Sequence, residues 1–150
     1  MKIHVRPVEA ADRAAWDRLY EGYAAFYGVD QTAQMRDTVF GWLMDEAHGS
    51  NGLVAETGDG ALVGLTHYRP FVSCLKACTN CFLDDLYVDP AARGSGAAQA
   101  LIAEVRRIAD HNGWHVVRWI TADDNYRGRG LYDKVATRTM WVTYDMPSVT

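Results

Sequence analysis

The sequence predicts an α/β fold in which helices flank both faces of a mixed central β-sheet. The first observation behind this prediction is periodicity. Apolar residues recur at helical spacing in some segments and alternate in others, in the order β-α-α-β-β-β-α-β-α-β. The second is size and composition: 150 residues, 49% of them hydrophobic and 23% charged, suit one core, so residues 1–150 are expected to form a single domain.

The N-terminal third predicts one strand and two helices. Residues 2–6 form the strand, which ends at Pro7, and Asp12 begins the first helix. A second helix is expected at about residues 32–47, with Gly49 beyond its end as a stop signal. The apolar positions of these two helices are Trp16, Leu19, Tyr20, Tyr23, Phe26, Met35, Val39, Trp42 and Leu43.

The middle third predicts three strands. Residues 52–57 and 62–69 are expected to form a hairpin, because residues 58–60 (Gly-Asp-Gly) supply the positive φ angles of a tight turn. Residues 81–88 form the next strand. Together the three segments predict the centre of the sheet.

The C-terminal third predicts two helices and two strands. A long amphipathic helix begins at Ala97 and stops at Asn112, which precedes a glycine. A buried strand at residues 116–121 and a helix at about residues 125–136 follow. Residues 140–146 are expected to form the closing strand.

Charge, hydropathy and cysteine content narrow the function classes. The net charge of −4 argues against a nucleic-acid partner and favours a cationic one. No apolar run approaches the ~18 residues of a membrane span, and no secretory signal is evident, so we expect a cytoplasmic protein without a membrane partner. Cys74, Cys78 and Cys81 with His67 are one candidate set of zinc ligands, but the uneven spacing of the cysteines favours reduced structural thiols, so we expect no metal site.

The connection between the strand at residues 81–88 and the long helix is shaped for a phosphate. Arg93 supplies a positive charge, and Gly94 and Gly96 leave the helix N-terminus, with its unpaired N–H groups, open to an anion. Such a turn also occurs without any ligand. The lysine and hydroxyl of a nucleoside-triphosphate loop are missing, and Gln99 stands where a dinucleotide fingerprint needs its third small residue.

Arg93, Gly96 and Ala98 satisfy the pattern Arg/Gln-x-x-Gly-x-Gly/Ala, and on this motif the sequence resembles the GNAT superfamily of acetyl-CoA-dependent N-acetyltransferases. The resemblance covers nearly the whole chain. Residues 3–8 are similar to the first strand of that family, and Asn125 together with residues 131–134 (Leu-Tyr-Asp-Lys) is similar to its late cofactor motif.

Within the superfamily, residues 83–88 (Leu-Asp-Asp-Leu-Tyr-Val) resemble the acidic strand of the histone and polyamine acetyltransferase branch. The resemblance implies that acetyl-CoA is the cosubstrate. It also implies that the acceptor is a polyamine-like small amine or a lysine-like side chain of a peptide. The implied cofactor-binding residues are Leu86, Tyr87, Val88, Arg93, Gly94, Ser95, Gly96, Ala97, Ala98 and Asn125.

Acetyl transfer to an amine requires a base, and the resemblance implies that the acidic strand supplies it. A lysine-like amine has a pKa of about 10.4, so at pH 7 only on the order of one molecule in 2,500 is neutral. We expect Asp84 to draw off the proton, directly or through a water molecule. Neighbouring strand residues point to opposite faces, so Asp85 is expected on the other face, as a structural partner or a substrate contact at the strand edge. Both carboxylates also fit purely structural ion pairs.

Tyr132 is the candidate acid, because its phenol keeps its proton at neutral pH and can pass it to the leaving thiolate. Backbone N–H groups of residues 86–88 would stabilise the thioester oxygen if this strand separates from residues 116–121. Five residues of the first helix are candidates for the amine pocket, although such an aromatic stripe also suits a core: Tyr20, Glu21, Tyr23, Phe26 and Tyr27.

Two further functions stay open. One is a non-catalytic acetyl-CoA-binding regulatory or sensor module, and the other is a phosphate-binding domain of another class. The acidic strand with Tyr132 argues against the first, and the missing lysine argues against the second. We also expect a homodimer, since the apolar residues 140–144 suit pairing between two copies, although a strand inside the sheet has the same pattern.

Overall fold

A computed structural model describes residues 2–149 of the chain. The described residues form two compact units, divided between residues 120 and 121, and each is described by itself. None of the described helices is both long enough and apolar enough to cross a lipid bilayer.

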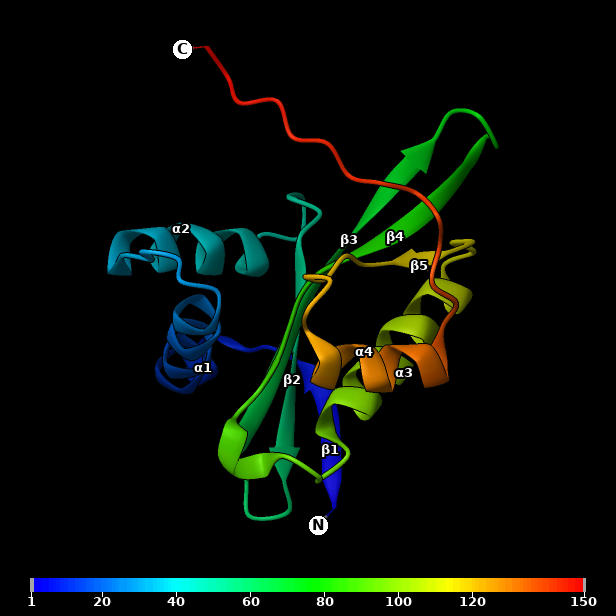
Figure 1. The fold of residues 1–150 in the computed structure, drawn as a ribbon. Coiled ribbons are helices and arrows are strands. Elements are labelled where there is room, and N and C mark those ends of the chain that lie inside the picture. Colours follow the sequence, from blue (N-terminus) through cyan, green and yellow to red (C-terminus); the bar gives the residue numbers. More distant parts are fainter. Residues whose placement is uncertain (1, 150) are drawn as a thin grey trace. The chain divides into compact units, whose positions relative to one another are not determined.

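The first unit is built on a five-stranded sheet in the order β1-β2-β3-β4-β5 (Figure 1). The strands are β1 (Ile3–Pro7), β2 (Asn51–Thr57), β3 (Leu62–Ser73), β4 (Cys78–Val88) and β5 (Val117–Arg118). Neighbouring strands are antiparallel from β1 to β4, whereas β4 and β5 are parallel. The predicted mixed sheet is therefore confirmed.

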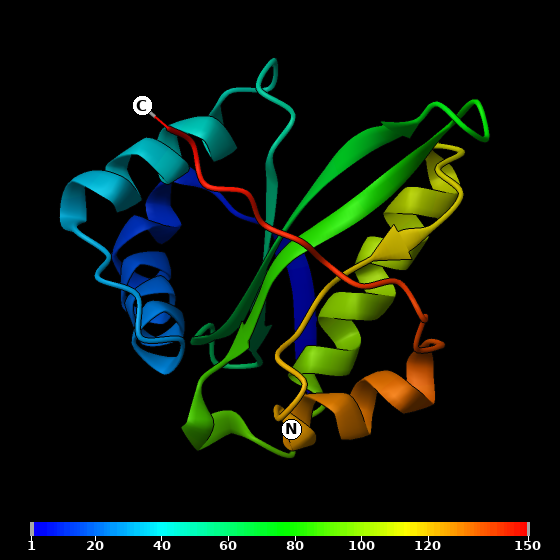
Figure 2. The ribbon, with the colours of Figure 1, turned by 45° about the horizontal axis from the view of Figure 1, so that its top comes forward.

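Helices cover both faces of this sheet, as predicted. Figure 2 shows α1 (Arg13–Phe26) and α2 (Ala33–Met44) on one face and α3 (Ala97–His111) on the other. Two short 3-10 helices, η1 (Ala10–Asp12) and η2 (Pro90–Ala92), precede α1 and α3. The faces are called the α1 face and the α3 face below.

The helices pack through part of the apolar stripes that their sequence patterns indicated, because Phe26 of α1 and Met35 and Trp42 of α2 are exposed. On the α1 face, Trp16 is fully buried in a cluster that includes Phe40 of α2 and Leu65 of β3. On the α3 face, Leu101 and Val105 are fully buried. The amphipathic stripes therefore orient both helix layers, because each stripe must leave water to be stabilised.

The β3–β4 hairpin is longer than predicted. Its ladder continues to the pair formed by Ser73 and Cys78, beyond the expected limits at residues 69 and 81. Cys81 is buried and Cys74 is exposed, and all three cysteines are free thiols. The strand predicted at residues 116–121 is shorter than expected, because only Val117 and Arg118 of β5 pair with β4.

The second unit contains α4 (Tyr126–Val135), close to the predicted helix. The predicted closing strand at residues 140–146 is wrong for the single chain, because residues 136–149 have no strand. A strand needs a hydrogen-bonded neighbour, and none is available to this segment within its own unit. Its large apolar side chains are 73% to 95% exposed: Met140, Trp141, Val142, Tyr144 and Met146.

Candidate active site

A β-bulge in β4 places Asp84 and Asp85 on the same face of the sheet. In the register of β3 and β4, His67 pairs with Asp85 and Tyr68 pairs with Leu83, so Asp84 is the extra residue. Asp85 contacts His67, and Asp84 contacts Arg69. Since residues two apart on a strand point to one face, both carboxylates lie on the α1 face. The expectation that they point to opposite faces is wrong, because alternation fails at a bulge.

Asp85 is held in a buried hydrogen-bond network. Its Oδ2 lies 2.8 Å from His67 Nδ1 and accepts a hydrogen bond of 3.0 Å from the Tyr20 hydroxyl. Trp16 Nε1 donates to His67 Nε2 at 3.0 Å. Because an indole nitrogen only donates, Nε2 is the acceptor and Nδ1 carries the proton that is donated to Asp85. The network therefore fixes the neutral tautomer of a histidine that is only 5% exposed.

The network keeps Asp85 ionised and its tyrosine partners protonated. Burial opposes ionisation of Asp85, but hydrogen bonds from His67, Tyr20 and Tyr23 outweigh it and hold the pKa of this carboxyl below its usual range. Burial, followed by the charge of Asp85, raises the pKa of Tyr20 and of Tyr23 above that of an ordinary phenol. Asp85 is therefore a fixed, half-buried anion at neutral pH.

Replacing Asp85 with Asn is expected to destabilise the fold, because the neutral amide loses the charge-assisted hydrogen bonds of this network. The expected loss is about 1–3 kcal/mol of unfolding free energy at pH 7. The folded pKa of Asp85 lies below the unfolded value of about 3.9, so this contribution is present above that pH and shrinks as the pH falls through the folded pKa.

Urea unfolding at pH 7 and at pH 3 measures this effect. Asp110→Asn is the matched control, since Asp110 is exposed on α3. Equal stabilities of the Asp85→Asn variant and the unaltered protein at pH 7 would contradict the prediction.

Asp84 is the more accessible of the two carboxylates. Arg69 Nε donates to its two oxygens at 3.2 and 3.1 Å, and 35% of the Asp84 side chain is exposed. Burial raises the pKa of Asp84 above its usual value, Arg69 opposes this shift, and the charge of Asp85 adds to it. The site therefore holds one fixed anion beside a carboxylate with an increased affinity for a proton.

The two parallel strands separate beside these carboxylates. Pairing between β4 and β5 covers only Cys81 with Val117 and Phe82 with Arg118. From residue 83 to residue 88, β4 therefore has no neighbouring strand on its β5 side in the described unit. The separation on which stabilisation of the thioester oxygen depends is therefore present, and it leaves this edge of β4 without a strand partner in the first unit.

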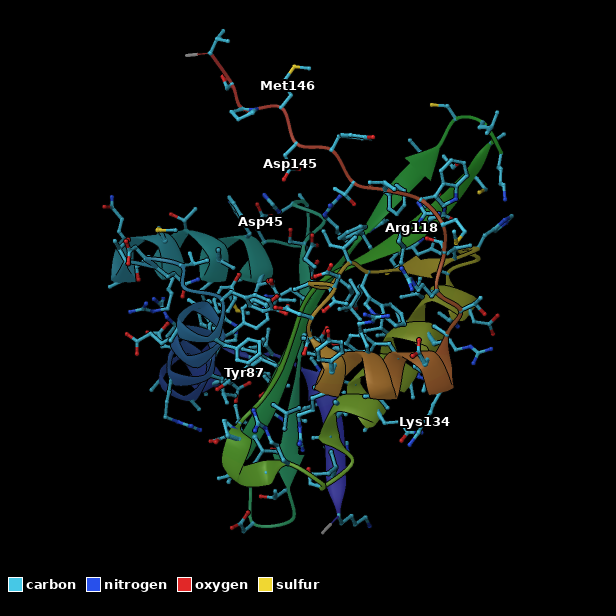
Figure 3. The ribbon with its side chains drawn as sticks, in the orientation of Figure 1. Asp45, Tyr87, Arg118, Lys134, Asp145 and Met146 are labelled. Atoms are coloured by element: carbon cyan, nitrogen blue, oxygen red, sulfur yellow. The ribbon has the colours of Figure 1, made fainter. Side chains whose placement is uncertain are left out.

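Tyr87 directs its side chain toward α1, so only its backbone faces the opening between the strands. Its ring packs on Gly22, where an added Cβ would lie 2.7 Å from the Tyr87 hydroxyl oxygen, and its centroid is 6.1 Å from that of Tyr23. Figure 3 shows Tyr87 between α1 and the sheet. Gly22 thus permits the close approach of α1 to β4.

The predicted phosphate loop leads into the N-terminus of α3. Gly96 is its N-cap, with a φ of 85° and no side-chain cap, and Gly94 has a φ of 83°. A Cβ added at either glycine would meet nothing within 4 Å, so their backbone lies open. Ser95 Oγ accepts from Ala97 N at 3.3 Å, and Arg93 is exposed. Open backbone, a helix N-terminus and a free cation fit the pyrophosphate of a nucleotide cofactor.

The predicted amine-pocket residues of α1 do not all lie at the carboxylate site formed by Asp84 and Asp85. Tyr23 reaches Asp85, whereas Glu21 pairs with Arg36 at 3.1 Å and is 61% exposed. Tyr27 is 42% exposed and contacts the Tyr23 ring. A hollow of about 630 Å³ lies between α1 and the α1–α2 connection, and Glu21 lines it. Glu21 therefore belongs to this hollow rather than to the carboxylate site.

Asn125 and Tyr132 belong to the second unit. Asn125 is the N-cap of α4: its Oδ1 accepts from Gly128 N at 3.3 Å, and its Nδ2 donates to Thr121 Oγ1 at 2.9 Å. Tyr132 lies in the C-terminal half of α4, where its backbone carbonyl accepts from Ala136 N. The helix predicted around both residues is confirmed, and their roles stay predictions.

Sequence reasoning gave Trp16 and Arg69 no site role, and it named Tyr20 only as a candidate for the amine pocket. Trp16 and Tyr20 belong to a helical stripe that has the pattern of a core, and they serve as core and as donors at once. No local pattern links His67 to Asp85, 18 residues later. Residues 2–149 contain no group of three or more His, Cys, Asp or Glu side chains placed to hold a metal ion.

Comparison with known proteins shows the family of the chain. The model of the acetyltransferase (GNAT) family matches residues 16–136, which include parts of both units. The D-amino-acid N-acetyltransferase HPA3 of Saccharomyces cerevisiae is 32% identical over 146 residues, which cover 95% of this chain and 89% of the yeast protein.

Two solved structures share the fold. The ribosomal-protein-alanine N-acetyltransferase from Brucella melitensis biovar Abortus 2308 is 22% identical, with a TM-score of 0.81 and coverage of 99% of this chain and 100% of that one. AAC(6')-Iy, solved with the bisubstrate analogue CoA-S-monomethyl-acetylneamine, is 17% identical, with a TM-score of 0.85 and 99% of each chain covered. On the family match and the yeast relative together, the chain belongs to the acetyltransferase (GNAT) family and is an acyltransferase.

Proposed function

We propose that this enzyme transfers the acetyl group of acetyl-CoA to a primary amine by direct attack, and that its acceptor is a small molecule. The observation that carries the proposal is the pair Asp84 and Asp85, which the bulge places together where β4 and β5 separate. The names of the relatives support a small acceptor: one is named for D-amino acids, and one was solved with a bisubstrate analogue.

The residues of the phosphate loop and of β4 fit acetyl-CoA. Arg93, Gly94 and Gly96, with the open N-terminus of α3, would bind its pyrophosphate. The unpaired edge of residues 86–88 would bind its extended arm by backbone hydrogen bonds. When bound, acetyl-CoA supplies the thioester carbonyl that the amine attacks.

Asp84 and Asp85 have different roles toward the amine. Asp85 stays ionised and attracts an ammonium group without leaving its network. Asp84, with its raised pKa and partial exposure, accepts the proton that must leave before the amine can attack. A fixed anion beside a base of increased proton affinity is the arrangement that this proton transfer requires.

The thiolate that departs needs a proton, and Tyr132 is the proposed donor, with Asn125 as a cofactor contact in the same family motif. A phenol with an ordinary pKa near 10 is protonated at neutral pH. The pKa of a thiol is about 8.5, close enough to that of the phenol for the phenol to transfer its proton to the thiolate. The family match includes both residues, which supports assigning them to one acetyltransferase domain with the first unit.

The test is the release of free CoA thiol from acetyl-CoA with a panel of polyamines, amino acids, aminoglycosides and lysine-containing peptides. Turnover with at least one small amine is expected, together with an acetylated product of the corresponding mass. Tight binding of acetyl-CoA without turnover on any amine would contradict the proposal.

We further propose that the protein is a homodimer joined through residues 140–146. In this segment Met140, Val142, Tyr144 and Met146 alternate with other residues, as one face of a strand does, and all four are exposed in the single chain. Pairing with a second copy would bury this apolar face and would give the backbone N–H and C=O groups of the segment hydrogen-bond partners.

Aspartate at Val142 and Tyr144 is expected to convert the dimer into a monomer, because it places charge on the proposed contact face. Light scattering coupled to size exclusion measures the mass. Thr143→Asp, on the opposite face of the segment, is the matched control and should remain dimeric. A monomeric unaltered protein, or a double variant that stays dimeric, would contradict the proposal.

A further inference from the structure

Two arginine side chains on the α1 face neither donate nor accept the transferred proton, although Arg69 is bonded to the proposed base, Asp84. The strand registers pair Arg69 of β3 with Phe82 of β4, and Phe82 with Arg118 of β5, so these residues form one row across three strands. The row adjoins Asp84, which Arg69 contacts through Nε. Arg118, labelled in Figure 3, thus comes from the last paired position before β4 and β5 separate.

Both guanidinium groups present hydrogen-bond donors that the first unit does not use. Arg69 bonds Asp84 through Nε, and Arg118 has a ring contact with Phe71, so within residues 2–120 neither pair of terminal nitrogens has an acceptor. Arg69 is 45% exposed at its side chain, and Arg118 is also exposed. A planar guanidinium with open terminal nitrogens matches the geometry of a carboxylate.

Aromatic rings hold these groups in place. Arg69 Cζ lies 5.0 Å from the centroid of the Phe82 ring, and Arg118 Cζ lies 5.7 Å from that of Phe71. The two phenylalanine rings are themselves in edge contact, with centroids 6.1 Å apart. Stacking on rings restricts both arginine side chains before a ligand binds, which lowers the entropy cost of binding.

We propose that Arg69 and Arg118 bind a carboxylate of the acceptor, and that the acceptor is a free α-amino acid. This inference rests on the proposed acetyl transfer to an amine. An α-amino acid carries its amine and its carboxylate on one carbon. The Arg69 guanidinium likewise has Asp84 on its Nε side and free donors at its other end. An ammonium beside Asp84 and a carboxylate on the free donors of Arg69 are therefore compatible with one small molecule.

The charges of this face favour a zwitterion over a polycation. Two carboxylates, Asp84 and Asp85, stand beside two guanidinium groups, so their formal charges sum to zero. A second ammonium group of a polyamine would meet Arg69 or Arg118 and be repelled. The same two arginines attract the carboxylate of an amino acid.

The test compares phenylalanine, phenylalaninamide and phenethylamine as acceptors, with kcat/KM expressed per neutral amine. Both enantiomers of the first two compounds are included. The unaltered enzyme is expected to prefer the amino acid at least tenfold over both compounds without a carboxylate. Arg69→Gln and Arg118→Gln should each lower the ratio of acid to amide by about tenfold to a hundredfold, mainly through KM. Arg107→Gln, on α3 and paired with Glu104, is the control that should keep the ratio.

The ratio of kcat/KM for the acid to that for the amide distinguishes carboxylate binding by Arg69 from its contact with Asp84. A loss of base function lowers the rates of all three acceptors together and leaves this ratio unchanged. Equal use of acid and amide by the unaltered enzyme, or a ratio that neither substitution lowers, overturns the carboxylate site and leaves acetyl transfer standing. The absence of CoA release with all three compounds and with the wider amine panel overturns the proposed function itself.

Discussion

Replacing Asp84 with Asn is expected to lower kcat/KM for the amine acceptor at least a hundredfold. The substitution preserves size and the hydrogen bond from Arg69, but it removes the group that accepts the ammonium proton. General acid–base catalysis by a positioned side chain contributes typically 10²–10⁴-fold, and this range sets the expected loss. CoA release under steady-state conditions measures it.

The pH profile gives this prediction a second readout. Asp84 acts as a base only when it is ionised, and its pKa is raised by burial and by the charge of Asp85. In the unaltered enzyme, kcat/KM per neutral amine is therefore expected to fall as the pH drops through this raised pKa. The Asp84→Asn variant should lose that step.

Asp110→Asn is again the matched control, since it removes an exposed carboxylate from α3. It should keep both the rate and the pH profile of the unaltered enzyme. An Asp84→Asn variant that retains its rate within about threefold would place the base elsewhere.

Replacing Tyr132 with Phe is expected to reduce kcat by about 10²-fold or more while the Kd of acetyl-CoA changes little. The substitution removes only the hydroxyl that would protonate the thiolate. It keeps the ring and the backbone hydrogen bond to Ala136 N, so α4 should persist. Single-turnover acetyl transfer and calorimetric binding of acetyl-CoA measure the two quantities separately.

Tyr126→Phe is the control on the same helix, because Tyr126 is 74% exposed at the first turn of α4. It should retain the full rate. A Tyr132→Phe variant with an unchanged kcat would show that another group, or a water molecule, protonates the thiolate. A variant that loses cofactor affinity together with kcat would instead assign Tyr132 to binding.

The phosphate loop shows why some of the site could be predicted. Its features lie within a few consecutive residues: Arg93, the two glycines with positive φ and the start of α3. Short-range geometry of this kind follows from glycine's tolerance of positive φ and from the unpaired amides of a helix N-terminus. The separation of β4 from β5 entered the sequence analysis only as a condition, and no residue of β5 predicts it.

The relation between Asp84 and Asp85 shows what could not be predicted. Strict alternation puts them on opposite faces, and the bulge that unites them depends on the register with β3. Nothing within residues 81–88 marks the extra residue, because a bulge is defined only against its partner strand. The carboxylates were identified as site candidates, and their common face was not.

The apolar segment at residues 140–146 also depends on a partner strand that its own sequence does not reveal. Its alternation predicts a strand, and the pattern is real, but a strand exists only where another strand offers hydrogen bonds. Sequence periodicity indicates which face of a segment is apolar and is stabilised by burial. It does not report whether the chain itself supplies the partner.

The sequence by itself therefore determined the order of helices and strands as far as α4, the helices on both faces of the sheet and the local conformation of the predicted phosphate loop, because each follows from patterns among residues close along the chain. Only the tertiary structure decided that Trp16, His67 and Asp85 share one network and that Arg69 lies beside Asp84. These contacts join residues of α1, β3 and β4 that lie up to 51 positions apart, and packing of the helix on the sheet and strand register alone bring them together.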